Sequence, residues 1–182
     1  CQEKDWLLAV DEVQTGVGRT GSLFCFQDYG ILPDVVSFAK GIGGGLPLAG
    51  IMAGAKTETV LTPGTHATTF GGNPICCAGG LSVLEQLDDA LLADVKKKGA
   101  YLKEKISAMP GVKEVRGMGL MLGVALTDQE GYGAKVNAMI EKGLLCLTAG
   151  HSTIRLLPPL TMSQGGKSER RCSFFLREGG RG

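Results

Sequence analysis

The chain has 182 residues, enough for one large domain or parts of two, and its apolar and charged fractions of 43% and 20% are ordinary for a soluble globular protein. A net charge of +1 gives no reason to expect nucleic acid or an anionic membrane as a partner, and no apolar run approaches the roughly 18 residues of a membrane span. The 6 cysteines show no CxxC spacing, which disfavours zinc sites and disulfides and indicates reduced thiols in a cytoplasmic protein.

Three short apolar runs open the chain and predict strands over residues 6–11, 34–38 and 48–54. Because the runs are nearly continuous and do not alternate with polar residues, they indicate buried strands in a sheet that is covered on both faces. The sequence therefore predicts an α/β arrangement for this part of the chain.

A long helix is predicted after the Thr- and Gly-rich loop 61–73. Asn73 is a suitable N-cap, and Pro74 suits the first helical position. Leucines and other apolar residues then recur on one face until Pro110, with a break at Gly99 or at Asp88-Asp89. The lysine run 96–98 within this segment is expected to lie on the surface.

The remainder predicts a small α+β unit. Strands are expected over 112–116 and 120–126, a helix over 132–142, and further strands over 144–148 and 153–157. We expect residues 1–95 to form the C-terminal portion of a large domain and residues 96–163 to form a small C-terminal domain. A disordered Gly/Arg-rich tail is expected over 164–182.

Two charged residues close two of the predicted strands. Asp11 ends the first strand, and Lys40 lies between the second strand and the glycine cluster 41–45. Singly, such residues are most often solvated or turn residues. A lysine at the end of a buried strand, however, is poorly solvated, which leaves its amine available as a nucleophile. Together the two suit a pyridoxal phosphate site, in which the lysine carries the cofactor as a Schiff base and the carboxylate keeps the pyridine nitrogen protonated.

Five ordered sequence blocks resemble the class III (ornithine-type) aminotransferases. The blocks are LAVDEVQTGVGRTG (8–21), FAKG with GLP (38–41 and 45–47), GTHATTFGGNP (64–74), RGMGLM (116–121) and IRLLPPLT (154–161). The resemblance implies the fold type I architecture of the aspartate aminotransferase superfamily: a portion of the large α/β domain followed by a small C-terminal α+β domain. It also implies pyridoxal 5'-phosphate as cofactor and a homodimer.

The resemblance also assigns roles to single residues. Lys40 would bind the cofactor and move the substrate proton, and Asp11 would hold the ring nitrogen. Val13 would pack on the ring face, and Gln14 would hydrogen-bond the phenolic oxygen, although simple backbone bonding is nearly as good an interpretation of Gln14. Thr69, with Thr68 as its alternative, would reach the cofactor phosphate of the neighbouring subunit.

In the last block, Arg155 places a charge within an apolar strand, which is costly unless the charge is paired. The resemblance implies that its guanidinium grips the substrate α-carboxylate through two parallel hydrogen bonds. A structural ion pair within the small domain is the alternative.

Within the class, the chain most resembles the members that use N-acetylornithine. This implies transfer of its δ-amino group to 2-oxoglutarate in arginine biosynthesis. A sister transaminase that uses ornithine, succinylornithine or 4-aminobutyrate is the alternative. The family has about half of its length before the point that corresponds to Cys1, so we also expect a C-terminal fragment that is inactive alone.

A dinucleotide-binding interpretation competes with this one, because Gly16, Gly18 and Gly21 spell GxGxxG after a strand. That fingerprint needs its third glycine to open a helix and an acid near the end of the following strand. Asp34 precedes the second strand instead of closing it, and an acidic pair separates the first strand from the glycines. An NAD site is therefore disfavoured.

Overall fold

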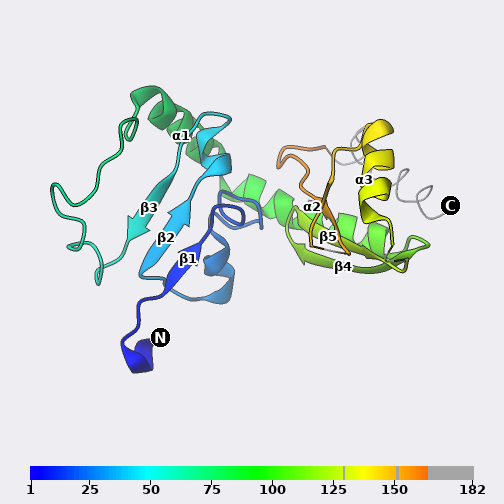
Figure 1. The fold of residues 1–182 in the computed structure, drawn as a ribbon, viewed down its shortest axis with the longest axis horizontal. Helices are drawn as coiled ribbons and strands as arrows, with labels where there is room; N and C mark the ends of the chain where they lie inside the picture. Colours follow the sequence, from blue (N-terminus) through cyan, green and yellow to red (C-terminus); the bar gives the residue numbers. More distant parts are fainter. Residues whose placement is uncertain (129, 151, 164–182) are drawn as a thin grey trace. The chain divides into compact units, whose positions relative to one another are not determined.

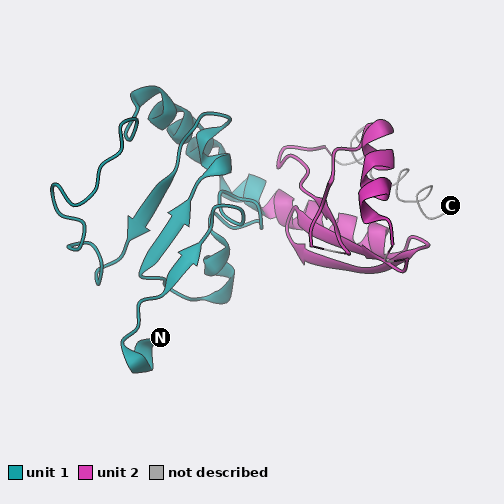
Figure 2. Ribbon diagram, in the orientation of Figure 1, with its two compact units in different colours: residues 1–92 teal, residues 93–182 magenta. Residues whose placement is uncertain are grey.

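The computed structural model describes residues 1–128, 130–150 and 152–163, so the tail predicted to be disordered lies outside the described residues. The chain forms two compact units, Cys1–Leu92 and a second unit that begins at Ala93 (Figure 2). Each unit has its own sheet (Figure 1). The domain boundaries stated above remain a prediction about the organisation of the protein.

The first unit is built on a three-stranded sheet in the order β1-β2-β3. The strands are β1 (Ala9–Asp11), β2 (Val35–Phe38) and β3 (Gly50–Ala53), each shorter than its predicted run. β1 pairs with β2 in parallel, and β2 pairs with β3 antiparallel. Because β1 and β2 are parallel, their carboxyl ends lie at the same edge of the sheet.

The predicted burial of this sheet is wrong for the described chain. β1 contains no buried residue, Ile51 of β3 is 54% exposed, and Val36 is the buried residue of β2. The cause is the architecture: β1 and β3 are edge strands, and the helix of this unit packs mainly against the turn after β2. Short 3-10 helices, η1 (Gln2–Lys4), η2 (Cys25–Tyr29) and η3 (Lys40–Gly43), complete the unit.

Helix α1 (Pro74–Gln86) begins where the sequence predicts. Asn73 accepts hydrogen bonds through Oδ1 from the backbone N–H groups of Ile75 and Cys76, at 3.0 and 3.2 Å. Pro74, which has no N–H, occupies the first helical position. The predicted N-terminus is confirmed.

The predicted long helix is broken at the second of its two candidate positions. Helix α2 (Asp89–Ser107) follows a short gap, and Asp88 caps it by accepting a hydrogen bond from Leu91 N at 2.7 Å. Gly99 lies inside α2 instead, where a Cβ atom would approach Gly119 O to 2.1 Å. None of the helices in the described ranges is both long and apolar enough to cross a membrane.

The second unit is an antiparallel sheet in the order β4-β5-β7-β6, packed with α2 and α3 (Tyr132–Glu141) around one core. The strands are β4 (Val112–Met118), β5 (Met121–Leu126), β6 (Leu147–Thr148) and β7 (Ile154–Leu156). Residues that are almost fully buried come from α2, from the turn between β4 and β5, and from strands β5 and β7: Val95, Ile106, Leu120, Leu122, Val124 and Ile154. The prediction that Lys98 lies on the surface is wrong. This residue is 6% exposed, pairs with Asp94 at 2.5 Å and donates to Leu160 O.

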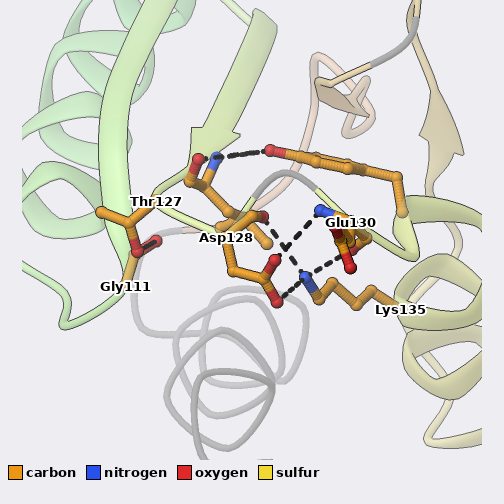
Figure 3. Close-up of polar contacts among 7 residues, drawn as sticks. Gly111, Thr127, Asp128, Glu130 and Lys135 are labelled. Atoms are coloured by element: carbon orange, nitrogen blue, oxygen red, sulfur yellow. Dashed lines mark hydrogen bonds and ion pairs between the residues drawn. The ribbon is translucent and has the colours of Figure 1, made fainter.

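The loop between β5 and α3 is held by one lysine (Figure 3). Lys135 Nζ donates to Asp128 Oδ2 at 2.6 Å and to the backbone oxygen of Glu130 at 2.7 Å. The hydrogen bond from Lys135 is the main cause that lowers the pKa of Asp128 from its ordinary value, followed by the bond from Glu130 N. Thr127 N donates to Gly111 O at 2.9 Å, which ties the same loop to the start of β4. The contacts fix the entry to α3.

The exposed apolar side chains lie mostly in the first unit, and this predicts a difference in solubility between the units. Leu32 is 88% exposed, Phe70 82% and Ile75 70%. Exposed apolar patches and open strand edges promote aggregation. Expressed alone, residues 1–182 are therefore expected to aggregate, as measured by light scattering and size-exclusion chromatography.

Residues 88–163 are the matched control, because they keep the Asp88 cap and the whole core of the second unit. We expect this piece to be monodisperse and to melt cooperatively. A monodisperse 1–182 chain, or aggregation of the control piece to the same extent, would contradict the assignment of aggregation to the first unit.

Candidate active site

The carboxyl ends of β1 and β2 bring Asp11 and Ser37 together. The two residues are register partners in the parallel pair. Asp11 Oδ1 accepts hydrogen bonds from Ser37 Oγ at 3.2 Å and from Val13 N at 2.9 Å. Both groups donate to the same oxygen, so Asp11 Oδ2 has no hydrogen-bond partner among the described residues. Asp11 is exposed.

Lys40 lies at the same edge, at the start of the turn η3 that follows β2. Its φ of 50° is in the left-handed region, which a lysine adopts only at a cost. Its side chain is exposed, so the expected desolvation of the amine is not provided by the described residues. The structure therefore gives Lys40 a defined backbone position but an open environment.

The turn that carries Lys40 is packed against α1 through two glycines that the sequence analysis did not single out. A Cβ atom on Gly79 would lie 3.3 Å from Gly43 O of this turn and 2.7 Å from Leu46 Cδ1. One on Gly80 would lie 3.5 Å from Ile42 O of the turn and 2.6 Å from Leu48 Cδ2. Adjacent glycines inside a helix cost stability, about 1 kcal/mol each relative to alanine. That cost was the available signal that α1 makes a close approach here.

The segment after Asp11 forms a compact loop, not the start of an α-helix. Val13 and Gln14 are half-buried in it, and the Gln14 side chain makes no hydrogen bond to the described residues. The glycines at 16, 18 and 21 lead into the 3-10 helix η2. A dinucleotide site needs an α-helix N-terminus at this point, so the structure argues against the NAD interpretation.

Thr69 lies in the exposed stretch 58–72 of the loop between β3 and α1. The neighbouring Thr68 accepts a hydrogen bond from Gly71 N at 3.4 Å, and a Cβ atom on Gly71 would come within 2.2 Å of Thr68 Cγ2. No hydrogen bond or ion pair among the described residues joins Thr69 to Asp11 or Lys40. Its role toward a neighbouring subunit stays a prediction.

In the second unit, Arg155 lies in the middle of β7 between two buried residues, Ile154 and Leu156. Its side chain is therefore on the sheet face opposite the core. Arg155 Nε is buried and has no hydrogen-bond partner, and the residue forms no ion pair with the described residues. The alternative of a structural ion pair is not found within this part of the chain.

A second arginine lies on the same face. Gly123 of β5 pairs with Arg116 on one side and with Arg155 on the other, so both arginines flank a position without a side chain. A Cβ atom at Gly123 would lie 3.6 Å from Arg116 Cγ and 3.0 Å from Thr153 Cγ2. Arg116 uses this space to donate to Thr153 Oγ1 at 2.6 Å, and it lies 3.6 Å from Glu114. Sequence analysis did not predict this arrangement, which depends on strand register.

Comparisons with known proteins agree with this geometry. A model of the family described as aminotransferase class III matches residues 1–170. The acetylornithine aminotransferase of Caldanaerobacter subterraneus is 44% identical over 169 residues, and that of Corynebacterium efficiens is 45% identical over 163. These alignments cover 90% of this chain and 42% and 40% of the two relatives.

Solved structures give the same result. The N-acetylornithine aminotransferase of Stenotrophomonas maltophilia matches with a TM-score of 0.86 at 32% identity, covering 98% of this chain and 48% of that one. The ornithine aminotransferase of Plasmodium yoelii matches with a TM-score of 0.89 at 29% identity, covering 100% of this chain and 49% of that one.

The chain belongs to the class III aminotransferases. The predicted family and the predicted α/β fold class, fold type I, are confirmed. The chain spans about two fifths of the length of the curated relatives it matches.

Proposed function

We propose that the protein is a pyridoxal phosphate-dependent aminotransferase that moves the δ-amino group of N-acetylornithine to 2-oxoglutarate. The observation that carries the proposal is the shared edge of β1 and β2, where Asp11 and the Lys40 turn follow parallel strands. The relatives named acetylornithine aminotransferase, at 44% and 45% identity, support the choice of amino donor.

The residues present fit this cofactor. Asp11 Oδ1 is held by two donors, which leaves Oδ2 to accept a hydrogen bond from a protonated pyridine nitrogen. When bound, pyridoxal phosphate supplies an aldehyde that takes up the amino group and a ring that accepts the electron pair of the substrate carbon.

The side chains of this chain supply the remaining functions. The Lys40 amine holds the cofactor and moves the proton at the substrate carbon as a general acid and base. Val13 contacts the ring, and Gln14, whose amide has no partner among the described residues, is free to donate to the ring oxygen. Thr69 binds the cofactor phosphate of the neighbouring subunit in a cytoplasmic homodimer.

Arg155 binds the α-carboxylate that donor and acceptor share. Its unpartnered Nε provides one arm of the planar fork that a carboxylate accepts. A buried N–H group without a partner is unfavourable, and a bound carboxylate satisfies it. This supports a ligand-binding role more than a structural one.

The test of the proposal is a donor panel with the intact protein, in which glutamate formation from 2-oxoglutarate is measured. N-acetylornithine is expected to give the highest kcat/KM among N-acetylornithine, succinylornithine, ornithine and 4-aminobutyrate. The highest value with another donor would assign a sister transaminase. No transfer from any of the four would contradict the proposed activity. Residues 1–182 alone are expected to be inactive even with excess cofactor.

Arg155→Ala is expected to weaken the binding of both carboxylate substrates by about 2–5 kcal/mol, because it removes a partly desolvated charge partner. Cofactor binding should be nearly unchanged. Steady-state kinetics for both substrates and a cofactor titration measure the two effects.

Arg116→Ala is the matched control, since this arginine lies on the same sheet face but is already bonded to Thr153. We expect a smaller effect on substrate binding from it. Loss of cofactor binding in Arg155→Ala with unchanged substrate affinity would favour a structural role instead.

A further inference from the structure

Glu12, the residue after Asp11, is a buried carboxylate with no cationic partner among the described residues. It is 1% exposed. Removing a charge from water is costly unless hydrogen bonds compensate for it. Glu12 Oε1 accepts a hydrogen bond from Phe26 N at 2.7 Å, and Oε2 accepts a short one from the Thr15 hydroxyl. Both carboxylate oxygens are therefore occupied within the loop that follows β1.

These bonds close the loop between β1 and η2 on the Glu12 side chain. Phe26 is 14 residues further along the chain, so its bond to Glu12 joins the two ends of the loop. The backbone adds to the closure, because Gly16 N donates to Glu12 O at 2.9 Å, and Glu12 N donates to Ser37 O on β2. A Cβ atom on Gly16 would lie 2.8 Å from Glu12 O. Glu12 thus links the loop to both strands of the candidate site.

The closed loop holds a strained residue against the turn that carries Lys40. Val17 has a φ of 56°, which is a genuine outlier for a β-branched side chain, and it is 7% exposed. Its Cβ and Cγ1 would lie 3.6 and 3.7 Å from a Cβ atom on Gly41. Lys40, adjacent to Gly41, also has a left-handed backbone. Such conformations persist only when surrounding contacts impose them.

We propose that Glu12 is a positioning residue for Lys40: its buried carboxylate closes the loop that presses Val17 against Gly41 and so fixes the turn from which the lysine amine projects. This inference rests on the proposed function, because it assigns the purpose of the strained turn to the placement of that amine. Glu12 is assigned no contact with the cofactor or the substrate, because both of its carboxylate oxygens already accept hydrogen bonds within the loop.

The test compares Glu12→Ala and Glu12→Gln in the intact protein. Cofactor is added back to the cofactor-free protein without any amino donor, and the rate of its attachment to Lys40 is followed by absorbance. The absorption spectrum of the bound cofactor is also recorded as a function of pH, and the pH at which its change is half complete is called the pH midpoint. The constants kcat and KM are measured as well. Because a small misplacement of a reacting group costs up to about 10²-fold in rate, Glu12→Ala should lower kcat and the attachment rate by about 10- to 100-fold with little change in KM.

Glu12→Gln should recover most of both rates, because its amide oxygen still accepts a hydrogen bond from Phe26 N. Thr57→Val is the matched control for a general loss of stability. Thr57 is 7% exposed in the same unit and donates to Asp34 O and Gly54 O, outside the Lys40 turn. This variant should melt at a lower temperature while its attachment rate, pH midpoint and kcat stay unchanged below the melt.

An unchanged attachment rate and pH midpoint in folded Glu12→Ala would overturn the proposal, as would equal changes in Thr57→Val. If Glu12→Ala does not fold, Thr15→Val decides, since it removes one of the two bonds to the carboxylate. A shifted pH midpoint and a lower attachment rate in Thr15→Val support the proposal, and unchanged values contradict it. Failure of the proposed function is distinguishable, because the wild-type protein would then not bind the cofactor at Lys40 at all.

Discussion

Lys40→Ala is expected to abolish transamination and the cofactor attachment that borohydride reduction makes permanent. No other residue of the strained turn η3 carries an amine, since Gly41, Ile42 and Gly43 follow Lys40. A general acid–base group alone contributes about 10²- to 10⁴-fold, and loss of covalent catalysis adds to this. The measurements are glutamate formation and peptide mapping of the reduced wild-type protein.

Lys56→Ala is the control for Lys40, because Lys56 is another exposed lysine of the first unit. Its ion pair with Asp5, at 2.6 Å, is on the surface, where such pairs contribute little. Activity should be unchanged in this variant. Turnover by Lys40→Ala, or reduced cofactor mapped to a different lysine, would reject the assignment of Lys40.

Asp11→Ala should reduce the rate by roughly two to four orders of magnitude. A cofactor ring seated on the exposed Asp11 would desolvate the carboxylate and the pyridinium, and removing one partner of such a pair costs about 3–5 kcal/mol. At about 1.4 kcal/mol per factor of ten, this gives the expected loss in kcat/KM. Steady-state kinetics at saturating cofactor measure it.

Ser37→Ala provides the graded comparison, because it removes only one of the two donors to Asp11 Oδ1 and leaves the bond from Val13 N. A single hydrogen bond to a charged group is worth about 1.5–3 kcal/mol at most, so its effect should be clearly smaller. A loss below about tenfold in Asp11→Ala would rule out Asp11 as the ring partner.

Local signals in the sequence were reliable where the chemistry is local. Asn73 and Pro74 predicted the start of α1 because a cap depends on a side chain and the backbone two or three residues away. The break at Asp88 has the same cause. By contrast, the local sequence indicated a possible helix break at Gly99. The reason for a glycine at this position is its close approach to Gly119, which belongs to another segment of the chain and has no local signal.

Burial was predicted poorly for the candidate site. Apolar composition indicated buried strands, but β1 and β3 are edge strands, and Asp11 and Lys40 are exposed. Composition records the preference of a side chain and carries no information on what covers it. For the same reason, the burial of Lys98 could not be predicted, because it depends on contacts with Asp94 and Leu160.

The sequence by itself determined the family and the order of chemical groups along the chain: an acid that ends one strand, a lysine that follows the next, and an arginine within a late apolar strand. Each of these features involves residues that are close together in the sequence, so a short sequence motif contains it. Only the tertiary structure decided which groups meet. The bond from Phe26 N to Glu12, the contact of Val17 with Gly41 and the placement of Arg116 beside Arg155 across Gly123 join residues far apart in the chain. Strand register and packing fix those pairs, and neither has a signal in the local sequence.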